Sequence, residues 1–318
     1  MTQLADLGVR QRTLTKARVL LDALPYMREH FNRTIVVKVG GAAMSDERLS
    51  ERFAEDIALL RMVGVRPIVV HGGGPQISAL SERLGLTPEF RDGHRVTDAE
   101  TLEVAKMVLV GKLNKDLVVH VNRAGVPALG LSGDDGNLLV AQKRSGTSGE
   151  DLGFVGDVTT VNRELLSQLM ESAVPVIASV ATDGNGQSYN VNADLVAAAV
   201  ASSVEASKIV LLTDVPGVIQ DDELVSELTV DDAEKLIESG HVSGGMIPKL
   251  EAVVRAMRSG VGRAHIVDGR VEHALILELF TPEGMGTMIT HPVPVPVEEE
   301  VGRELERGAR PEAGGALA

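Results

Sequence analysis

The sequence predicts an α/β fold in which helices cover a mainly parallel sheet. Short β-branched runs alternate along the chain with segments of helical periodicity, which is the pattern of parallel strands joined by crossover helices. Hydrophobic residues make up 44% of the chain and aromatic residues only 2%, so the core must be built from Val, Leu, Ile and Ala. The length of 318 residues is enough for one large domain or two smaller lobes.

Six short runs rich in Val and Ile predict the strands of this sheet. They are TIVVKV at 34–39, RPIVVH at 66–71, VPALGL at 126–131, VPVIASV at 174–180, KIVLLT at 208–213 and RAHIVD at 263–268.

Helical periodicity fills the segments between these runs. A long helix is expected from about residue 98 to residue 124, behind a cap at Thr97/Asp98. It is longer than one sheet face usually needs, so it is also a candidate for a subunit contact. Apolar residues at near-helical spacing between the first two runs complete a β-α-β unit, at Leu49, Phe53, Ile57 and Leu60. Further helices are predicted at 194–204, 231–239 and 248–259.

The two ends of the chain differ from this body. Residues 13–30 form an amphipathic helical pattern with Pro25 inside it, and a kink is expected there because proline removes a hydrogen bond and clashes with the preceding turn. This helix has no predicted strand of its own to cover, so we treat 1–32 as a separate N-terminal element. After Ile289 the sequence HPVPVPV should be extended, and the charged segment that follows predicts a disordered tail over 293–318.

The charge balance and the missing cysteines exclude several function classes. Lys and Arg number 31 against 45 Asp and Glu, giving a net charge of −14, the wrong sign for general nucleic-acid binding. With no cysteine, the chain can form no disulfide, no thiolate zinc site and no cysteine nucleophile. The first residues lack the apolar stretch of a secretory signal, and no apolar run is long enough to span a bilayer. We expect a cytoplasmic protein without a membrane contact.

Lys38 is the sharpest local anomaly in the sequence. It lies inside the buried run TIVVKV, where a lysine is costly unless an anion or a carboxylate faces it. Gly40 and Gly41 follow directly, and they would let a bound group approach the backbone at the carboxyl end of the strand, where open α/β sheets place ligands. Lys38 is therefore a candidate phosphate clamp. The alternative is a lysine at a sheet edge whose stem reaches solvent.

A glycine-rich turn follows the second strand. The sequence reads His71-Gly72-Gly73-Gly74-Pro75 before a helical pattern, and proline suits the first helical turn. Three glycines leave consecutive backbone N–H groups free to face an anion at the helix N-terminus, which predicts an anion cradle. The alternative is a tight strand-to-helix turn. Neither a Walker A motif nor the Rossmann GxGxxG fingerprint occurs in the chain.

Five further polar residues could face the same ligand. Arg95 carries the rigid fork that matches a carboxylate, although a loop arginine is more often solvated. Asn190, Asn192 and Asp194 alternate at the start of a small-residue helix, where capping accounts for at least one of them. Asp194 could hold lysines in position by charge pairing. A second basic residue, Lys249, follows a glycine pair at the entry to another predicted helix.

Taken together, these motifs resemble the amino acid kinase family, and within it the members that phosphorylate N-acetyl-L-glutamate. The resemblance covers about residues 12–291, with KVGGAAM, VVHGGGPQI, GHRVTD, YNVNAD, LLTDVPGV and GGMIPKL in the family's order. It implies a three-layer αβα sandwich with a mainly parallel central sheet and two lobes. Residues 33–206 would form the acceptor-substrate lobe with the dimer contact, and 207–292 the ATP-binding lobe with a regulatory site.

The resemblance also implies roles for individual residues. Lys38 and Lys249 would stabilise the charge on the transferring phosphoryl group, and Asp194 would orient both lysines. The residues implied for the acceptor acid are Gly73, Gly74, Arg95, Asn190 and Asn192. Those implied for ATP are Gly40, Gly41, Thr213, Asp214, Gly217, Gly245 and Met246. Mg²⁺ would travel on the ATP phosphates, and no metal site on the protein is expected.

The N-terminal helix resembles the extra segment of the arginine-inhibited members of this family, in which it joins dimers into a hexamer, a trimer of dimers. His265, Glu278 and Gly284 match the arginine site of that branch, with Tyr26 contributed from the helix. Inhibition by L-arginine is the hypothesis that follows. Without the resemblance, Glu278 would be interpreted as a helix-end glutamate in solvent.

The implied chemistry agrees with the residue types. A carboxylate is already nucleophilic at neutral pH, so its phosphorylation needs charge neutralisation and alignment rather than a general base. Three alternatives remain. Another member of the family would phosphorylate glutamate, aspartate, carbamate or a nucleoside monophosphate. A catalytically silent amino-acid sensor is disfavoured by Lys38, Lys249 and Asp194, and a Rossmann dehydrogenase by the missing glycine fingerprint.

Overall fold

A computed structural model describes residues 2–41, 44–91, 93–146, 149–242 and 244–292, with the side chains of 2–12 left aside. The tail at 293–318, for which we expect disorder, lies outside the described residues. None of the helices in the described ranges combines the length and the apolar composition needed to cross a bilayer.

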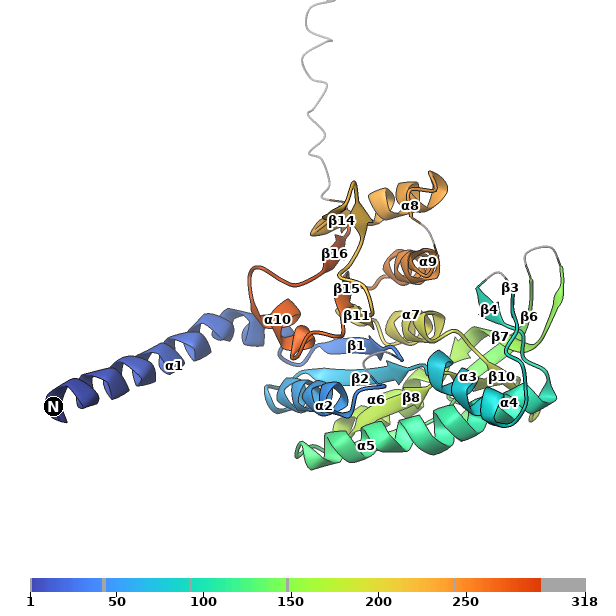
Figure 1. Ribbon diagram of the computed structural model, residues 1–318, viewed down its shortest axis with the longest axis horizontal. Helices are drawn as coiled ribbons and strands as arrows, with labels where there is room; N and C mark the ends of the chain where they lie inside the picture. The colour runs from blue at the N-terminus through green and yellow to red at the C-terminus, as the bar shows by residue number, and fades with distance from the viewer. Residues whose placement is uncertain (1, 42–43, 92, 147–148, 243, 293–318) are drawn as a thin grey trace, which may run out of the picture.

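One eight-stranded sheet forms the centre of the molecule (Figure 1). Its order is β14-β16-β15-β11-β1-β2-β8-β5. All its neighbouring strands pair in parallel except β15 and β16, which confirms the mainly parallel sheet. The strands are β1 (Thr34–Val39), β2 (Arg66–His71), β5 (Ala128–Leu131), β8 (Val174–Ala178), β11 (Lys208–Thr213), β14 (Glu227–Thr229), β15 (Arg263–Asp268) and β16 (Thr287–Thr290).

Four of the six predicted strands coincide with observed ones, namely β1, β2, β11 and β15. The run at 126–131 begins two residues later than predicted, as β5. The run at 174–180 is divided at Ser179, because β8 ends at Ala178 and the residues after Ser179 form β9 (Val180–Thr182), which belongs to a different sheet. The hydrophobic pattern alone does not reveal this change of partner.

Helices cover both faces of the sheet, so the predicted three-layer αβα sandwich is confirmed. Alternation along β1 sends Val36 to one face and Ile35, Val37 and Val39 to the other. The face of Val36 packs against α6 (Arg163–Ser172), α7 (Ala193–Ser203), α8 (Val230–Glu238) and α9 (Met246–Arg258). The opposite face packs against α2 (Glu47–Met62), α5 (Asn114–Arg123) and α10 (Ala274–Phe280).

A small closed barrel lies beyond the carboxyl ends of the central strands and was not predicted. It contains β6 (Leu139–Ser145), β7 (Asp151–Val161), β9 and β10 (Ser188–Asn190). Two short hairpins, β3 (Phe90–Arg91) with β4 (His94–Arg95) and β12 (Ile219–Gln220) with β13 (Glu223–Leu224), and one 3-10 turn at Asp135–Asn137 complete the connections.

The long helix predicted at 98–124 is continuous but changes geometry in the middle. It begins as α4 (Ala99–Lys106), becomes a π-helix over Met107–Leu113, and continues as α5. The predicted cap is present, because the Oδ1 atom of Asp98 accepts a hydrogen bond of 2.8 Å from the Thr101 amide. With α3 (Gly74–Arg83), the π-helix packs over the end of β8 and β9.

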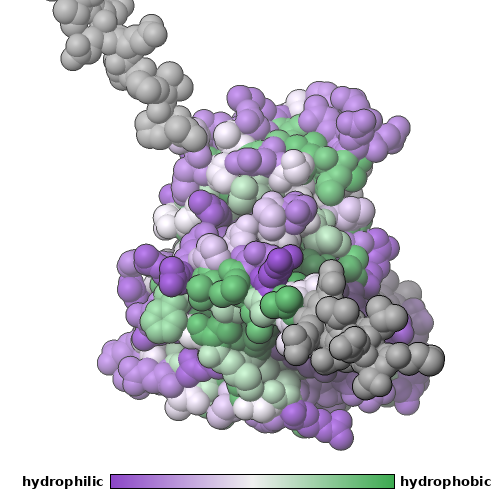
Figure 2. Space-filling model, turned by 90° about the vertical axis from the view of Figure 1, so that its left-hand side faces the viewer, coloured by the Kyte–Doolittle hydropathy of each residue, from purple (hydrophilic) through white to green (hydrophobic). Residues whose placement is uncertain are grey.

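The N-terminal helix α1 (Thr2–His30) is longer than the predicted 13–30 and continues through Pro25. It projects away from the body beside α10 (Figure 1). Its end is anchored by His30, whose Nε2 atom lies 3.1 Å from the Leu279 carbonyl oxygen and whose ring packs edge-on against Phe280. Hydrophobic side chains gather on the face from which it projects (Figure 2), and the exposed ones on and just after α1 include Leu14, Val19, Leu20, Leu21, Leu24 and Phe31.

Candidate functional site

Two lysines contact opposite oxygens of one buried carboxylate. Lys38 comes from the middle of the sheet and faces α7, as Val36 does, while Lys249 comes from the first turns of α9. The Lys38 Nζ atom lies 2.9 Å from Oδ1 of Asp194, and the Lys249 Nζ atom lies 3.1 Å from Oδ2. The side chains of Lys38 and Asp194 are only 9% and 6% exposed, so this is a buried ion cluster rather than a sheet-edge lysine.

The electrostatics of the cluster favour an added anion. Burial alone would raise the pKa of Asp194, but the charges and hydrogen bonds of Lys38 and Lys249 more than offset it and hold the pKa below its usual range. Asp194 is therefore ionised at neutral pH. Two ammonium groups against one carboxylate leave a local excess of one positive charge, and buried excess charge is costly unless an anion compensates it.

A cavity opens beside this cluster and brings together most of the residues predicted to bind substrate. The strand register places it, because Lys38 pairs with Val70 and Val39 with His71, so the glycine turn after β2 lies next to the glycines after β1. Its lining includes Lys38, Gly40, Gly41, Gly73, Gly74, Arg95, Asn190, Asn192 and Asp194. Lys249 reaches the cluster from outside this lining, through Asp194.

Close packing explains two of the glycines. A Cβ atom built on Gly41 would lie 2.8 Å from the Cδ atom of Pro75, closer than real Cβ contacts allow. A Cβ atom on Gly73 would collide with the Leu113 side chain. Glycine at these two positions leaves room for Pro75 and Leu113, and it lets the backbone of both turns approach a ligand closely.

Arg95 is buried, and one of its guanidinium nitrogens is already hydrogen-bonded within the protein. Its Nη2 atom donates to the Gly74 carbonyl at 2.9 Å and to the Ser78 hydroxyl at 2.8 Å, and its guanidinium lies 4.6 Å from the centre of the Phe90 ring. Burial lowers the pKa of Arg95. Its Nη1 atom is buried without a partner among the described groups, which leaves a donor for a bound carboxylate. A solvated loop arginine is excluded, because only 7% of the residue is exposed.

The two asparagines have different environments. Asn192 caps α7, since its Oδ1 atom accepts from the amides of Asp194 at 2.8 Å and Leu195 at 3.3 Å. Asn190 donates to the hydroxyl of Thr97 at 3.2 Å. Capping therefore accounts for the Oδ1 atom of Asn192, although both residues also line the cavity.

The residues predicted for the nucleotide are more dispersed. Thr213 and Asp214 lie at the carboxyl end of β11, next to Gly40, and the Thr213 hydroxyl donates to Asp214 at 3.1 Å. Gly217 packs against Thr287, and Gly245 precedes Met246 at the start of α9. None of Thr213, Asp214, Gly217, Gly245 and Met246 lines the cavity beside Lys38, so the structure does not place these residues in that cavity.

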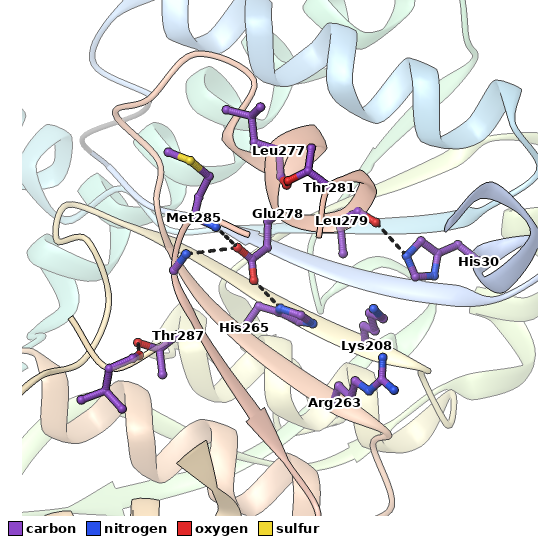
Figure 3. A network of polar contacts seen from close by, with 12 residues as sticks. His30, Lys208, Arg263, His265, Leu277, Glu278, Leu279, Thr281, Met285 and Thr287 are labelled. Atoms are coloured by element: carbon purple, nitrogen blue, oxygen red, sulfur yellow. Dashed lines mark hydrogen bonds and ion pairs between the residues drawn. The ribbon is translucent and has the colours of Figure 1, made fainter. Parts of the chain in front are cut away.

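A second cavity brings together the four residues matched to an arginine site, Tyr26, His265, Glu278 and Gly284. His265 and Glu278 interact at 2.6 Å, and the other oxygen of Glu278 accepts from the amides of Met285 at 2.6 Å and Gly286 at 3.1 Å (Figure 3). Glu278 is thus buried, and the interpretation as a solvated helix-end glutamate is wrong.

The protonation states of this pair follow from its contacts. Burial lowers the pKa of His265 and would by itself raise that of Glu278. The hydrogen bonds from His265 and from two backbone amides reverse the second effect, so the pKa of Glu278 lies below its usual range. Both pKa shifts are explained by a neutral His265 that donates its Nδ1 hydrogen to an ionised Glu278.

The sequence analysis missed five charged residues of this cavity, namely Glu29, Lys208, Glu227, Arg263 and Glu283. An oxygen of Glu29 lies 3.5 Å from the Lys208 ammonium and 3.1 Å from the Arg263 guanidinium. Lys208 begins a fully buried strand, and this is the same signal that identified Lys38. Among the residues that the structure describes, no group of three His, Asp or Glu side chains is arranged to hold a metal ion.

Comparisons with known proteins give the relatives of this chain. Residues 33–268 match the model of the amino acid kinase family. The acetylglutamate kinase of Symbiobacterium thermophilum is 51% identical over 289 residues, which cover 88% of this chain and 99% of that protein.

Two solved structures of the N-acetylglutamate synthase of Neisseria gonorrhoeae also match. The complex with coenzyme A and N-acetyl-glutamate has a TM-score of 0.80 at 27% identity, and the match covers 87% of this chain and 64% of that one. The complex with coenzyme A and L-arginine has a TM-score of 0.75 at 25% identity, covering 87% and 66%.

Proposed function

The chain belongs to the amino acid kinase family, and we propose that it transfers the terminal phosphoryl group of ATP to the side-chain carboxylate of N-acetyl-L-glutamate. The product is N-acetyl-L-glutamyl 5-phosphate, and the step serves arginine biosynthesis in the cytoplasm. The observation that carries the proposal is the convergence of Lys38 and Lys249 on Asp194, beside two glycine turns. The acetylglutamate kinases at about 50% identity support the choice of acceptor.

The chemistry requires two anions to be brought together. The acceptor carboxylate attacks the γ-phosphorus, the bond to the bridging oxygen of ADP breaks, and charge develops on the phosphoryl oxygens and on that leaving oxygen. Lys38 and Lys249 neutralise this charge, and Asp194 holds both ammonium groups in place. No general base is needed because the attacking carboxylate is already ionised.

The remaining residues bind the substrates. Arg95, with its unpartnered Nη1 atom, binds the α-carboxylate of the acceptor, and Asn190 and Asn192 contact the same molecule. Gly73 and Gly74 offer backbone amides to the reacting groups. The residues assigned to the ATP phosphates, ribose and base are Gly40, Gly41, Thr213, Asp214, Gly217, Gly245 and Met246. Mg²⁺ accompanies the ATP phosphates, in keeping with a site built from cations and amides.

The two lobes follow from these assignments. We assign the acceptor and the dimer contact to residues 33–206, and ATP and the regulatory site to residues 207–292. Because β1 pairs directly with β11, the junction between the lobes lies inside the central sheet.

We also propose that L-arginine inhibits the enzyme by binding the cavity of Tyr26, His265, Glu278 and Gly284. An ionised, buried Glu278 suits the cationic side chain of arginine. The same cavity contains Lys208 and Arg263, both paired with Glu29, and these cations suit the carboxylate of the ligand. A relative of the same fold binds L-arginine. Exposed leucines on the projecting α1 support a homo-hexamer, a trimer of dimers joined through this helix.

The deciding assay supplies ATP, Mg²⁺ and N-acetyl-L-glutamate and traps the acyl phosphate with hydroxylamine. Parallel reactions contain glutamate, aspartate or carbamate as the acceptor. Hydroxamate formed only from the acetylated acid is the expected result. Product formed preferentially from glutamate or aspartate, or ADP released preferentially with carbamate, would assign the chain to another acceptor in the family.

A further inference from the structure

His71 and Asn114 form a buried pair behind the glycine turn. Both residues are fully buried, and His71 is the last residue of β2, immediately before Gly72. The His71 Nε2 atom lies 3.1 Å from the Nδ2 atom of Asn114, and its Nδ1 atom lies 3.1 Å from the carbonyl oxygen of Gly72. A carboxamide from α5 is thus linked through an imidazole to the backbone of the turn.

The contacts of Asn114 determine which group donates in the hydrogen bonds that link Asn114, His71 and Gly72. Its Nδ2 atom also lies 2.8 Å from the carbonyl oxygen of Val176 and 3.4 Å from that of Leu131, and its Oδ1 atom accepts from Lys115. The nitrogen therefore donates, so His71 must accept at Nε2. The ring hydrogen is then on Nδ1 and is donated to the Gly72 carbonyl.

Burial keeps this arrangement in one protonation state. It lowers the pKa of His71 to about 4, and the nearby Lys115 charge acts in the same direction. The imidazole is neutral at physiological pH, and its tautomer is set by Asn114.

The direction of the Gly72 carbonyl determines that of the next amide. Strand alternation places His71 on the sheet face of Val69, whereas Lys38 lies on the opposite face with Val36. In a trans peptide the carbonyl oxygen and the following N–H point in opposite directions. A Gly72 carbonyl drawn toward His71 therefore turns the Gly73 N–H toward the side of Lys38, where Gly73 lines the cavity.

The same helix restrains the turn by contact. Leu109 and Leu113 of the π-helix occupy the space into which a Gly73 side chain would project. The backbone N–H of Asn114 bonds to the Leu109 carbonyl at the i to i+5 spacing of a π-helix, so Leu109 lies beside Gly73 while Asn114 contacts His71 from the same segment. Steric and polar restraints on the turn thus come from one segment.

We propose that His71 and Asn114 are positioning residues that hold the Gly72–Gly73 peptide with its N–H directed at the anion site beside Lys38. This inference rests on the proposed phosphoryl transfer. Neither residue lines the cavity, so each acts through the glycine backbone.

A matched pair of substitutions tests the proposal. In His71→Asn, the amide nitrogen can take the position of Nδ1 and still donate to Gly72. In His71→Gln, the amide takes the position of Nε2, so contact with Asn114 is kept and the donor to Gly72 is lost. Both variants lose the imidazole ring of His71, so any loss of packing affects both variants equally. We expect the kcat of the Gln variant to be about tenfold or more below that of the Asn variant, with similar KM values for the acceptor.

Equal kcat values in the two variants, or an effect confined to KM, would overturn the proposal. All variants are assayed with whichever acceptor the wild type phosphorylates. If the proposed acceptor is wrong, the wild type itself will not phosphorylate it. If this inference is wrong, the wild type is active but the two variants do not differ in kcat. Nitrogen-15 NMR of the wild-type imidazole gives an independent measurement if either variant fails to fold. It should show a neutral ring with the hydrogen on Nδ1 between about pH 5.5 and 8, and the other tautomer or a charged ring would contradict the assignment.

Discussion

Lys38 and Lys249 contact opposite oxygens of a single carboxylate, although one comes from the central strand and the other from a helix near the end of the fold. Neither lysine is held by its local sequence alone. Asp194 fixes both, and it is itself fixed by Asn192 at the start of α7.

Replacing either lysine should therefore abolish most of the turnover. We expect Lys38→Ala and Lys249→Ala each to lower kcat at least about 10²-fold, because each removes a donor to charge that develops in the transition state. Steady-state kinetics with ATP and the acceptor acid provide the measurement. Lys235→Ala, at an exposed lysine of α8, is the control and should retain full activity. Near-normal turnover in both site variants would refute the assigned roles.

Arg95→Lys should mainly raise KM for the acceptor acid. A lysine cannot reproduce the fork that contacts Gly74 and Ser78 while presenting a second nitrogen to a carboxylate. The phosphoryl path is untouched, so kcat should change much less than KM. The matched control is Arg91→Lys, on the exposed partner strand of the same hairpin. An unchanged KM would remove Arg95 from the acceptor site.

Glu278→Gln should relieve inhibition by L-arginine. The glutamine still accepts from the amides of Met285 and Gly286, so the loop is retained while the negative charge is lost. A charge-assisted hydrogen bond is worth about 1.5–3 kcal/mol, so half-inhibition should require roughly 10- to 100-fold more arginine. Titration of activity with arginine tests this, with the exposed Glu272→Gln as the control. Unaltered inhibition would place the arginine elsewhere.

Asp56 should make the protein less stable as the pH rises. Burial raises the pKa of Asp56 to about 6, despite a 2.6 Å hydrogen bond with His273. A carboxyl with a raised pKa binds its proton more tightly in the folded state, so the free energy of unfolding falls between about pH 4 and 6. A shift of roughly two units corresponds to at most about 3 kcal/mol.

Asp56→Asn should therefore stabilise the protein at pH 7.5 and much less at pH 4.5, as measured by urea denaturation at both values. Asp116→Asn, at an exposed residue of α5, should show no such difference. A stabilisation independent of pH would contradict the assignment to ionisation.

Leu21→Asp should dissociate the proposed hexamer into dimers. Leu21 is 65% exposed on α1, and a charge there cannot be buried against a partner helix. Light scattering of the eluted protein gives the mass, and kinase activity should persist because α1 lies away from the two lysines. Leu84→Asp, at an exposed leucine after α3, should leave the mass unchanged. A hexamer that survives the α1 substitution would argue for a different contact.

Six of the eight strands of the central sheet were predictable from the sequence, because they are largely buried on both faces and form continuous apolar runs. Lys38 was identifiable for the same reason, since a charged residue stands out against such a run. The edge strand β14 and its neighbour β16 were missed, because they are only three and four residues long and are partly exposed. The barrel strands β6 and β7 were missed, because they belong to a second sheet in which burial alternates and glycines interrupt the pattern.

Contacts between residues far apart in the sequence could not be predicted from the sequence pattern. Asn114 has no local signal, because its function depends on His71 and on two strand carbonyls that only the folded sheet brings near it. The π-helix that precedes Asn114 was not predicted either, because an apolar helical pattern does not distinguish i to i+5 hydrogen bonds from the i to i+4 bonds of an α-helix.

The direct pairing of β1 with β11 limits how the enzyme can move. The strand that carries Lys38 and the strand that ends at Thr213 are neighbours in one sheet, joined by backbone hydrogen bonds. A relative movement of the two proposed lobes would therefore twist this continuous sheet, and the backbone hydrogen bonds between β1 and β11 would transmit the strain from one half to the other.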